Sequence, residues 1–349
     1  MVSPLHMVFF LIGLAFVFDV FNGFHDAANS VATVVTTRVL SPIQAVFWAA
    51  FFNFVAAFVF GTRVAKTISD KLIDPKVVDL YVIFGGLIGA IVWDIITWLM
   101  ALPTSSSHAI ISAYAGGAIA KAGFHSLLLK GWVPVITFLV VSPIIGLILG
   151  YIFMVIASWF SHKTERHKAE RTFSRLQLIS AGAYSLGHGT NDAQKTMGII
   201  AALLVSSGKK EWTQGHFHFL WAKHELALWI ILSCHAAMAI GTMLGGWRIV
   251  KTIGSRITPH LHPMGGFSAE LAAATTIGLA TIASVPISTT HAIGGAVSGV
   301  GATRGAHAVR WIWGQRIVWA WLLTFPGAAI LGAFAYWLGS FALKPFIGQ

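Results

Sequence analysis

Two short segments place carboxylate and amide side chains inside apolar sequence. The first reads NGFHDAAN, from Asn22 to Asn29, and follows the apolar run MVFFLIGLAFVFDVF. On a helix, Asn22, Asp26 and Asn29 share one face. Their oxygens suit a hard cation such as Na⁺, and the carboxylate can equally carry a proton. Because an ionised carboxylate at membrane depth is costly without a partner, Asp26 is a candidate functional residue.

The second segment reads HGTNDAQKT and begins at His188. Its Asp192 aligns with Asp26 of the first segment, and His188, Asp192 and Lys195 again share one helical face. A simpler interpretation is that these Asn and Asp side chains only cap broken helices. The recurrence of the acid in both segments favours cation or proton binding by Asp26 and Asp192.

A second pair of motifs has hydroxyl side chains after a proline. They read LPTSSSHAI from Leu102 and VPISTTHAI from Val285, and small residues follow each of them. Proline and hydroxyl side chains are typical of helix N-termini, where free N–H groups bind anions such as phosphate. Each segment is shorter than the ~20 residues of a full crossing, so we expect two re-entrant half-helices. The candidate phosphate ligands are Ser105, Ser106, Ser107, His108, Ser288, Thr289, Thr290, His291 and Lys195.

Several of these polar residues also have purely structural interpretations. Ser and Thr are frequent where membrane helices pack. His108 and His291 can be neutral side chains that bond to backbone carbonyls instead of binding phosphate or moving protons. Asp19 and Asp94 have no counterpart in the other half and can each pair with a neighbouring helix. Glu270 can belong to the first turn of a helix.

The elements that must position these motifs are membrane-spanning helices. Of the 349 residues, 56% are hydrophobic and only 10% are charged, against about 25% in soluble domains. Several apolar runs reach the ~20 residues that cross a bilayer, and they lack the two-residue alternation of a β-barrel. We therefore predict an all-α integral membrane protein. The apolar runs cover approximately residues 7–21, 43–60, 80–102, 133–160, 226–247, 271–285 and 311–338.

The basic residues indicate how the chain lies in the membrane. The formal net charge is +11, but most of it falls in short segments between the apolar runs, so nucleic acid is not an expected partner. The densest basic cluster, from Lys163 to Arg175, belongs in the cytoplasm by the positive-inside rule. With an odd number of crossings in each half, we expect both termini outside.

Few other side chains are candidates for metal binding. The single Cys234 excludes an intramolecular disulfide and a multi-cysteine metal site. His216 and His218 lie in the polar segment SSGKKEWTQGHFHF, which we expect to be a loop, and His224 follows it. Because no spacing among these histidines is typical of a metal site, we expect them to be solvated.

The two kinds of motif occur in the same order in both halves of the chain. This order predicts an internal duplication, with a first repeat at residues 1–160, a basic linker at 161–175 and a second repeat at 176–349. In transporters, broken helices from two such repeats meet at a binding site near the bilayer midplane. The motifs therefore predict a single site built from both halves.

Together the four motifs favour a symporter. The acidic segments supply oxygens for a cation and the half-helix ends supply donors for an anion, and binding both lowers the cost of each charge in a low-dielectric site. A channel would need a continuous polar pore, which broken helices interrupt. A Ser–His hydrolase is disfavoured because the adjacent Ser107 and His108 point about 100° apart on a helix. Sulfate or another oxyanion is an alternative substrate.

The four motifs resemble those of the inorganic phosphate transporter (Pit) family, in particular the bacterial low-affinity phosphate permeases. NGFHDAANSVAT resembles the first family signature and HGTNDAQKTMGI the second, and the resemblance covers nearly the whole chain. It implies two inverted repeats with re-entrant or broken helix pairs, phosphate uptake driven by H⁺ or Na⁺, the bacterial inner membrane and commonly a homodimer. It implies neither enzyme activity nor a cofactor beyond the co-transported ion. The signature residues that it carries over are Asp26, Asn29, Asn191 and Asp192. With Asn22 and His25 of the first segment, they are the candidate residues for cation or proton coupling.

The two signatures differ in ways that bear on the coupling ion. Lys195 stands where the first signature has Asn29, and His25 stands where the second has an asparagine. A lysine charge beside Asp192 can take the role of a bound cation. Asp26 has only His25 and neutral amides nearby, so we favour H⁺ over Na⁺, with phosphate carried free or as a metal–phosphate complex. A full pair of sodium sites would instead use Asp26, Asn29, Asn191 and Asp192.

Overall fold

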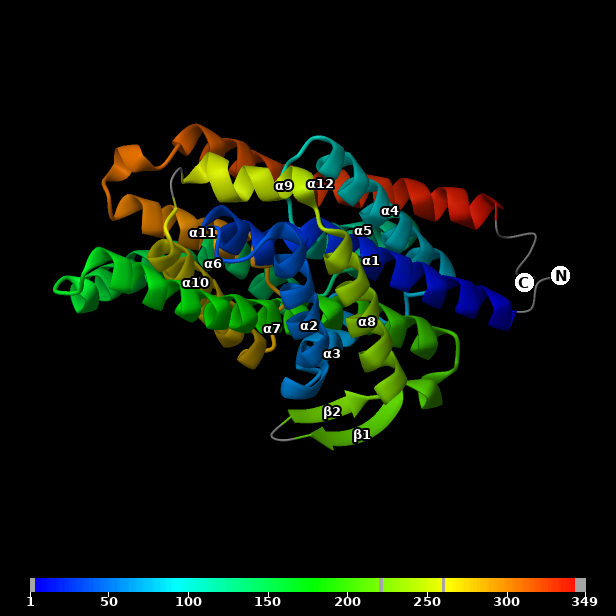
Figure 1. The fold of residues 1–349 in the computed structure, drawn as a ribbon. Coiled ribbons are helices and arrows are strands. Elements are labelled where there is room, and N and C mark those ends of the chain that lie inside the picture. The colour runs from blue at the N-terminus through cyan, green and yellow to red at the C-terminus, as the bar shows by residue number, and fades with distance from the viewer. Residues whose placement is uncertain (1–3, 220–221, 259–260, 343–349) are drawn as a thin grey trace.

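The computed structural model describes residues 4–219, 222–258 and 261–342, and this part of the chain is almost entirely helical (Figure 1). The two terminal segments, whose predicted location is outside the cell, lie outside the described residues. A π-helical turn, η3 (Thr252–Ile257), continues α9. The helices are α1 (Pro4–Thr36), α2 (Pro42–Val59), α3 (Arg63–Lys71), α4 (Leu80–Leu99), α5 (Ser106–Ala122), α6 (Leu129–Ser161), α7 (Arg166–Ser206), α8 (Leu228–Leu244), α9 (Trp247–Lys251), α10 (Pro263–Ile282), α11 (Thr289–Ala302) and α12 (Trp311–Ala342).

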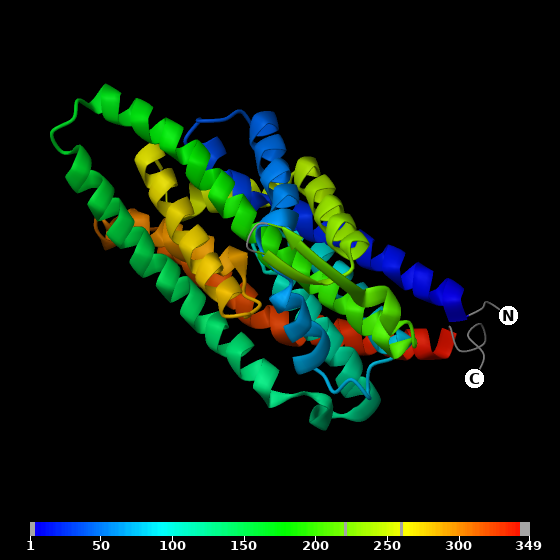
Figure 2. The ribbon, with the colours of Figure 1, turned by 90° about the horizontal axis from the view of Figure 1, so that it is seen from below.

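The long helices run between two faces of the molecule. We call the face that carries the α6–α7 connection the linker face, and the face that carries the strands β1 (Gln214–Phe219) and β2 (Ala222–Leu226) the hairpin face. α1 begins at the hairpin face, where the rings of Phe9 and Trp212 lie 5.9 Å apart. It ends at the linker face, where Thr37 donates to Gln177 near the start of α7. α1 and α7 therefore cross the molecule in opposite directions (Figure 2).

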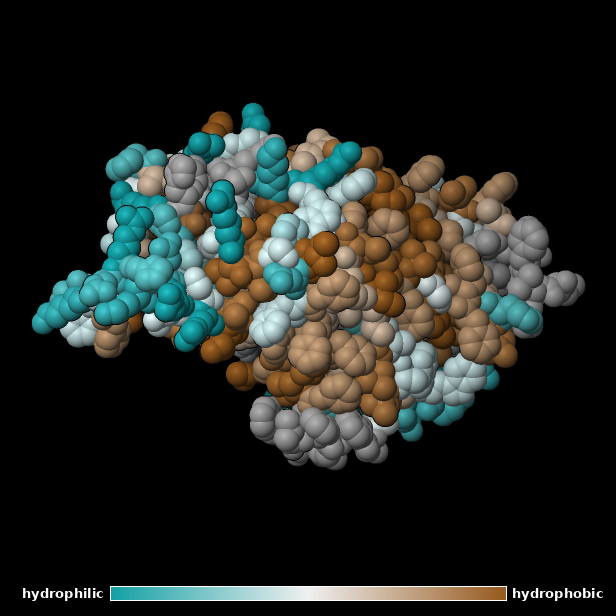
Figure 3. All heavy atoms as spheres, in the orientation of Figure 1, coloured by the Kyte–Doolittle hydropathy of each residue, from teal (hydrophilic) through white to brown (hydrophobic). Residues whose placement is uncertain are grey.

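The apolar helices form a multi-pass membrane protein. Among the described helices, α1, α2, α4, α6 and α12 are long and apolar enough to cross a membrane. α8 and α9 are so only when taken together, and a bend of 62° separates them, as in a broken span or a re-entrant loop. The most apolar part of α6 is only 17% buried, which indicates a lipid-facing helix. Figure 3 shows hydrophobic residues across the middle of the molecule and hydrophilic residues over the α6–α7 connection. The predicted run at 271–285 forms more than half of α10, which is not among the described helices that are long and apolar enough to cross a membrane.

The two hydroxyl motifs form helix N-termini, as predicted. Ser105 caps α5 and Ser288 caps α11, and each side-chain oxygen accepts a backbone N–H at 3.2 Å. The helices that follow have 17 and 14 residues, which is short for a crossing. Proline shortly before each cap keeps the preceding residue out of the helical region. The sequence pattern therefore identified both half-helices and where each begins.

Each half-helix pairs with the helix before it to form a helical hairpin. The open end of α4–α5, where Lys121 pairs with Asp79 at 2.7 Å, lies beside α3. The open end of α10–α11 lies at the linker face, where Phe267 packs on Phe173 of α7 at 5.7 Å. The two helical hairpins thus enter the bundle from opposite faces and bring their tips into its interior.

The two halves of the chain are interlaced. α6 packs on α10 and α11, whereas α12 packs on α4 and α5. Similarly, α1 packs on α8 and α7 packs on α2. A Cβ atom at Gly23 would lie 2.2 Å from the Met238 carbonyl oxygen of α8, and one at Gly189 would lie 2.7 Å from the Asn53 carbonyl oxygen of α2. The glycine shared by both acidic motifs therefore allows helices of opposite halves to approach closely.

The polar segment after α7 is not a loop, and this prediction was wrong. Residues Lys210–Thr213 form a 3₁₀ turn, and β1 pairs with β2 in antiparallel register, with Phe217 opposite His224. His224 is only 2% exposed, so the expectation of a solvated side chain was also wrong for this residue. The strand pairing places His224 beside α3 and α7 in the lining of one cavity, which the polar composition of the segment did not reveal. The side chains of His216 and His218 lie outside what the structure describes.

Candidate functional site

The acidic motifs lie in the middle of continuous helices. Asp26 on α1 and Asp192 on α7 are both buried, and neither is near a helix end, so they do not cap broken helices. A carboxylate oxygen of each and a ring nitrogen of His188 lie within 4.8 Å of one another. Two helices that run in opposite directions thus bring the two predicted acids together in the interior.

Lys195 is the cation of this acidic cluster. Its side chain is 1% exposed, and its ammonium donates to Asp192 on the same helix and to the Ser107 hydroxyl of α5. It also donates to the Ile287 carbonyl, in the tip of α10–α11, at 2.9 Å. The contact with Asp192 follows from helical spacing, but the other two require the fold. One buried ammonium therefore joins the α7 motif to both helical hairpins.

The second hydroxyl motif contacts both acidic motifs. Thr289 Oγ1 donates to Asp192 at 3.3 Å. Thr290 Oγ1 accepts from the Asn29 amide at 2.8 Å and donates to the Thr104 carbonyl at 3.1 Å. Because Thr104 belongs to the tip of α4–α5, the tips of both helical hairpins meet at the acidic cluster. This convergence is the arrangement that the four motifs predicted.

Donors for an anion remain at this meeting point. The hydroxyl oxygens of Ser105 and Ser288 each accept a backbone N–H of the helix that they cap. The Ser106 hydroxyl, in contrast, is buried and has no hydrogen-bond partner among the described residues. The first N–H groups of a helix have no acceptor within the helix, so α5 and α11 each offer further donors. The chemistry of these groups suits an oxyanion.

The surroundings of Asp26 differ from those of Asp192. His25 Nδ1 lies 3.2 Å from one carboxylate oxygen of Asp26, and its Nε2 lies 3.1 Å from Thr97 Oγ1 of α4. The other carboxylate oxygen of Asp26 is buried and has no hydrogen-bond partner among the described residues. Since an unpaired carboxylate is costly in an apolar interior, a proton or a small cation stabilises this position.

The remaining amides of the acidic motifs hold neighbouring backbone and side chains. Asn191 accepts the Ile287 N–H at 3.2 Å and donates to Thr281 at 3.1 Å, so it fixes the tip of α10–α11. Asn22 donates to Asp19 at 3.5 Å, a long hydrogen bond one turn earlier on α1. Asn191 is therefore a support of the site, and Asn22 lies at its edge.

The two histidines of the hydroxyl motifs pack against each other and against α12. The rings of His108 and His291 lie 4.9 Å apart, and Phe325 lies 4.9 Å from the His108 ring. The His291 ring stacks on Trp321 at 3.7 Å, and its Nδ1 lies 3.3 Å from the Leu139 carbonyl oxygen. A buried histidine bonded to a backbone carbonyl, one of the two interpretations of the sequence, describes His291. Phosphate binding by either histidine stays a prediction.

Glu270 lies deeper in the fold than a first-turn residue, so that interpretation was wrong. It is the eighth residue of α10 and is fully buried. Thr33 donates to one carboxylate oxygen at 2.6 Å and Gln177 donates to the same oxygen at 2.9 Å, while Ser180 donates to the other at 2.5 Å. The signal in the sequence was an acid just before an apolar run, together with Thr33 two turns after Asp26 on the same helical face.

Two further buried acids lie next to the site. Neither carboxylate oxygen of Asp94 has a hydrogen-bond partner among the described residues, and Asp94 and His25 line one cavity of about 360 Å³ between α1 and α4. Asp19 has one oxygen without such a partner. Asp19 nevertheless contacts Thr196 of α7 and Cys234 of α8, and Asp94 contacts Ser106 of α5. Both acids therefore lie against polar groups of neighbouring helices, which agrees with their structural interpretation.

The charges of the central cluster do not balance by themselves. Asp26, Asp192 and Lys195 together carry one net negative charge when both acids are ionised, because the ammonium compensates only one carboxylate. One bound proton or monovalent cation makes this group neutral. An anion can then enter at the half-helix ends at a lower electrostatic cost.

Comparisons with known proteins agree with this chemistry. A family model described as the phosphate transporter family matches residues 22–332. A probable low-affinity inorganic phosphate transporter of Rhizobium meliloti is 49% identical over 326 residues, which cover 93% of this chain and 94% of that protein. One of Bacillus subtilis is 42% identical with the same coverage. A solved structure titled the sodium-dependent phosphate transporter has a similar fold, with a TM-score of 0.82 and 24% identity over 96% of this chain and 99% of that one.

Proposed function

The chain belongs to the phosphate transporter family, and we propose that it is a secondary transporter that takes up inorganic phosphate together with H⁺. The observation that carries this proposal is the position of Lys195. Its ammonium lies between the carboxylate of Asp192 and the hydroxyl of Ser107, at the meeting point of both half-helix ends. A phosphate oxygen can replace Asp192 as an acceptor for this ammonium once the acidic cluster has bound a cation.

Coupling between the proton and phosphate follows because both act on the charge of the acidic cluster. When a proton neutralises Asp26, the acidic cluster no longer repels an incoming anion, so proton and phosphate bind better together than separately. The predicted phosphate ligands in this scheme are the hydroxyls of the two half-helix ends, with Lys195 as the fixed cation. The predicted proton carrier is Asp26, supported by its unpartnered carboxylate oxygen and its contact with His25.

Sodium is the second candidate for the coupling ion. The oxygens of Asp26 and Asp192 and a ring nitrogen of His188 lie close enough together to bind one metal ion. The similar solved structure is titled as sodium-dependent. Proton coupling is favoured because a lysine already compensates Asp192 and because Asn191 is engaged with the tip of α10–α11.

The same proposal includes the arrangement of the repeats, the orientation in the membrane and the location in the cell. The entry of the two helical hairpins from opposite faces supports two inverted repeats. Arg166 and Arg304 line one pocket at the linker face, which supports a cytoplasmic location for this face by the positive-inside rule. Because the similar phosphate transporters are bacterial, we propose the bacterial inner membrane as the location. A homodimer and a metal–phosphate complex as the carried species stay predictions, and sulfate or another oxyanion stays an alternative substrate.

Uptake by the purified protein in liposomes tests the proposal. Labelled phosphate is supplied outside, and a pH gradient and a sodium gradient are imposed separately, with sulfate as competitor. We expect accumulation with the pH gradient alone, and competition by sulfate would show that the site accepts other oxyanions as well. Accumulation with the sodium gradient alone would replace H⁺ by Na⁺, and absence of uptake under both gradients would contradict symport.

A further inference from the structure

The tips of the two helical hairpins contain the same unusual backbone conformation. Ala101 follows α4 with a φ of 54°, and Ser284 follows α10 with a φ of 62°. Each stands two residues before the proline of a hydroxyl motif. For a non-glycine residue this left-handed conformation is strained, so the surrounding structure must hold it.

Each of these two residues is held by a threonine from the opposite half of the chain. Thr67 of α3 donates its hydroxyl to the Ser284 carbonyl at 3.0 Å. Thr252 of η3 donates its hydroxyl to the Ala101 carbonyl at 3.2 Å. Both threonines are buried. The same type of contact therefore occurs twice, between a short helical segment of one half and the hairpin tip of the other.

The two contacts lie on opposite sides of the acidic cluster. α3 packs on α7 beyond Lys195, where a Cβ at Gly198 would lie 2.7 Å from the Ala65 carbonyl oxygen. η3 packs on α1 beyond Asp26, where a Cβ at Gly254 would lie 2.8 Å from the Ala32 carbonyl oxygen. Because α1 ends at the linker face and α7 ends at the hairpin face, α3 covers the site from the hairpin face. η3 covers it from the linker face.

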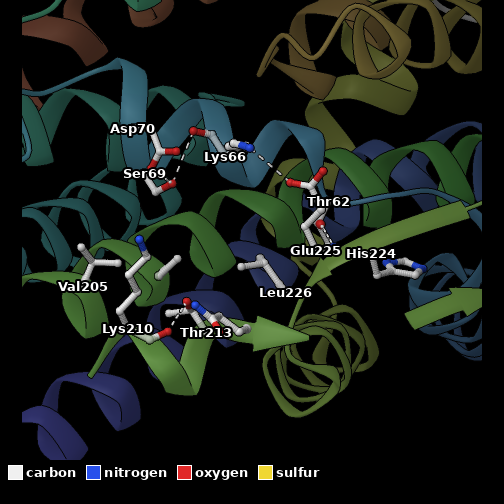
Figure 4. Close-up of a pocket in the computed structure, with 12 residues that line it drawn as sticks. Thr62, Lys66, Ser69, Asp70, Val205, Lys210, Thr213, His224, Glu225 and Leu226 are labelled. Atoms are coloured by element: carbon white, nitrogen blue, oxygen red, sulfur yellow. Dashed lines mark hydrogen bonds and ion pairs between the residues drawn. The ribbon is translucent and has the colours of Figure 1, made fainter. Parts of the chain in front are cut away.

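The segment that carries Thr67 is a short helix whose apolar residues Val64, Ala65 and Ile68 are buried against α7, and polar contacts join it to α7 and to β2. The Gln194 side chain accepts the Val64 N–H at 2.8 Å at the start of α3. Lys66 pairs with Glu225 of β2 at 3.3 Å, and both side chains are more than half exposed. A cavity of about 710 Å³ lies between α3, α7 and the β-hairpin (Figure 4). α3 can thus move away from α10–α11 without the displacement of a spanning helix.

The segment that carries Thr252 can also move, because it follows a bend in the chain. α9 and η3 follow a bend of 62° after α8. The connection contains Gly245, whose φ of 68° favours glycine. At this face Arg248 of α9 donates to the Leu99 carbonyl at 3.4 Å and lies over the Trp98 ring at 4.8 Å. A rotation at the bend can separate η3 from the tip of α4–α5 while α8 stays in place.

We propose that Thr67 and Thr252 are positioning residues that close the phosphate site, Thr67 toward the hairpin face and Thr252 toward the linker face, each by holding the re-entrant tip of the other half. The structure, with both bonds made, corresponds to a closed state. Opening one bond at a time exposes the site to one face, whereas opening both would leave a continuous path for ions. This inference rests on the proposed transport function, which requires that the site face each side in turn.

Labelling of single thiols from each face tests the assignment. In a Cys234→Ser background, Ala202→Cys places a reporter on the face of α7 that Gly198 presents to α3. Ala32→Cys places a second reporter under η3. Each reporter is combined with Thr67→Val or Thr252→Val and is labelled by a membrane-impermeant maleimide in vesicles of both orientations. The labelling needs neither phosphate nor an ion gradient, so its outcome is independent of the coupling ion and of the transported substrate.

The expected result is opposite for the two threonines. Thr67→Val should raise the labelling rate of the Ala202→Cys thiol several-fold from the hairpin face only, and Thr252→Val should do the same for the Ala32→Cys thiol from the linker face only. Thr→Ser at either position keeps the donor and should restore slow labelling. Unchanged rates, an effect of only one threonine, or faster labelling of both thiols from both faces would overturn the proposal. If a valine variant does not accumulate in the membrane, Thr→Ala provides the same comparison.

Discussion

The acidic motifs of α1 and α7 occupy equivalent places in the two halves but differ in the charge beside each carboxylate. Asp192 contacts the ammonium of Lys195, which belongs to the same helix. Asp26 contacts His25 and keeps one oxygen without a partner among the described residues. A lysine cannot leave the protein during transport, whereas a proton or a sodium ion can. The α7 motif is therefore suited to hold the anion, and the α1 motif is suited to load the coupling ion.

This difference shows how two similar motifs can have different charges beside their acids while both lie in the middle of long helices. Both motifs keep the glycine that packs on the other half and the acid that follows it. Only the positions around the acid differ. If that difference sets the roles of the two halves, substitutions that exchange those residues should break the roles separately.

The largest effect is expected for Asp26→Asn. The variant keeps the shape of the side chain but has no carboxylate that a proton could neutralise. Phosphate accumulation driven by a pH gradient should therefore fall on the order of 100-fold, which is near the upper end of typical coupling factors. Exchange of internal for external phosphate should persist, because it needs no net movement of the coupling ion. Uptake and exchange in liposomes measure the two activities. Asp70→Asn, at an exposed acid of α3, is the matched control, and gradient-driven accumulation by Asp26→Asn at the control level would contradict the assigned role.

The next effect concerns Lys195→Asn, which makes the α7 motif resemble the α1 motif. Removing one partner of a buried ion pair costs about 3–5 kcal/mol, and a sodium ion beside Asp192 can offset part of it. We expect phosphate uptake to fall about tenfold in potassium medium and to recover partly when sodium replaces potassium. Lys195→Arg, which keeps the charge, is the control. If the Asn variant transports at the wild-type rate in both media, Lys195 has no electrostatic role in the site.

A smaller effect is expected at the half-helix ends. Ser106→Val and Thr289→Val remove hydroxyls that are predicted to bind phosphate, and each should raise the KM for phosphate several-fold, in line with about 1 kcal/mol per hydrogen bond. Ser105→Ala and Ser288→Ala remove helix caps instead and should lower the melting temperature of the purified protein more than they change KM. Measuring KM and thermal unfolding for all four variants separates the two roles. Wild-type KM in both Val variants would remove these hydroxyls from the phosphate site.

The smallest effect is expected for Glu270→Gln. Glutamine keeps the size of the side chain and one acceptor oxygen for Thr33 and Gln177, so only the charge and part of the hydrogen bonding change. Because no cation is paired with Glu270 among the described residues, we expect uptake to fall by no more than a few-fold, about 1 kcal/mol. Initial rates across a range of external pH measure it. A loss as large as that of Asp26→Asn would mean that Glu270 also carries the coupling ion.

Local spacing explains what could be predicted from the sequence. Helical periodicity placed Lys195 beside Asp192, and proline followed by hydroxyls located the starts of α5 and α11. These features depend on residues within one or two turns of each other. The apolar runs similarly identified α1, α2, α4, α6 and α12, because a span needs about 20 apolar residues. They did not identify α7, which crosses the molecule with a more polar sequence.

Contacts between distant segments explain what the sequence did not reveal. Nothing near Lys195 in the chain points to Ser107, and nothing near Thr67 points to Ser284, since these contacts exist only after the helices pack. The environment of Glu270 was missed for the same reason, because its three donors come from α1 and α7. The strands β1 and β2 were missed because their polar composition resembles that of a loop.

The interlacing of the two halves bears on how the protein is made. When the ribosome has completed α6, the first half is in the membrane without α12, α8 and α7, which later cover α4, α5, α1 and α2. Until then Asp26 and the first hydroxyl motif lack the segments that surround them in the finished fold. Translation of the second half therefore completes the first, and neither half matures as an independent unit. Two polypeptides divided between α6 and α7 should consequently regain transport only when a cell synthesises both.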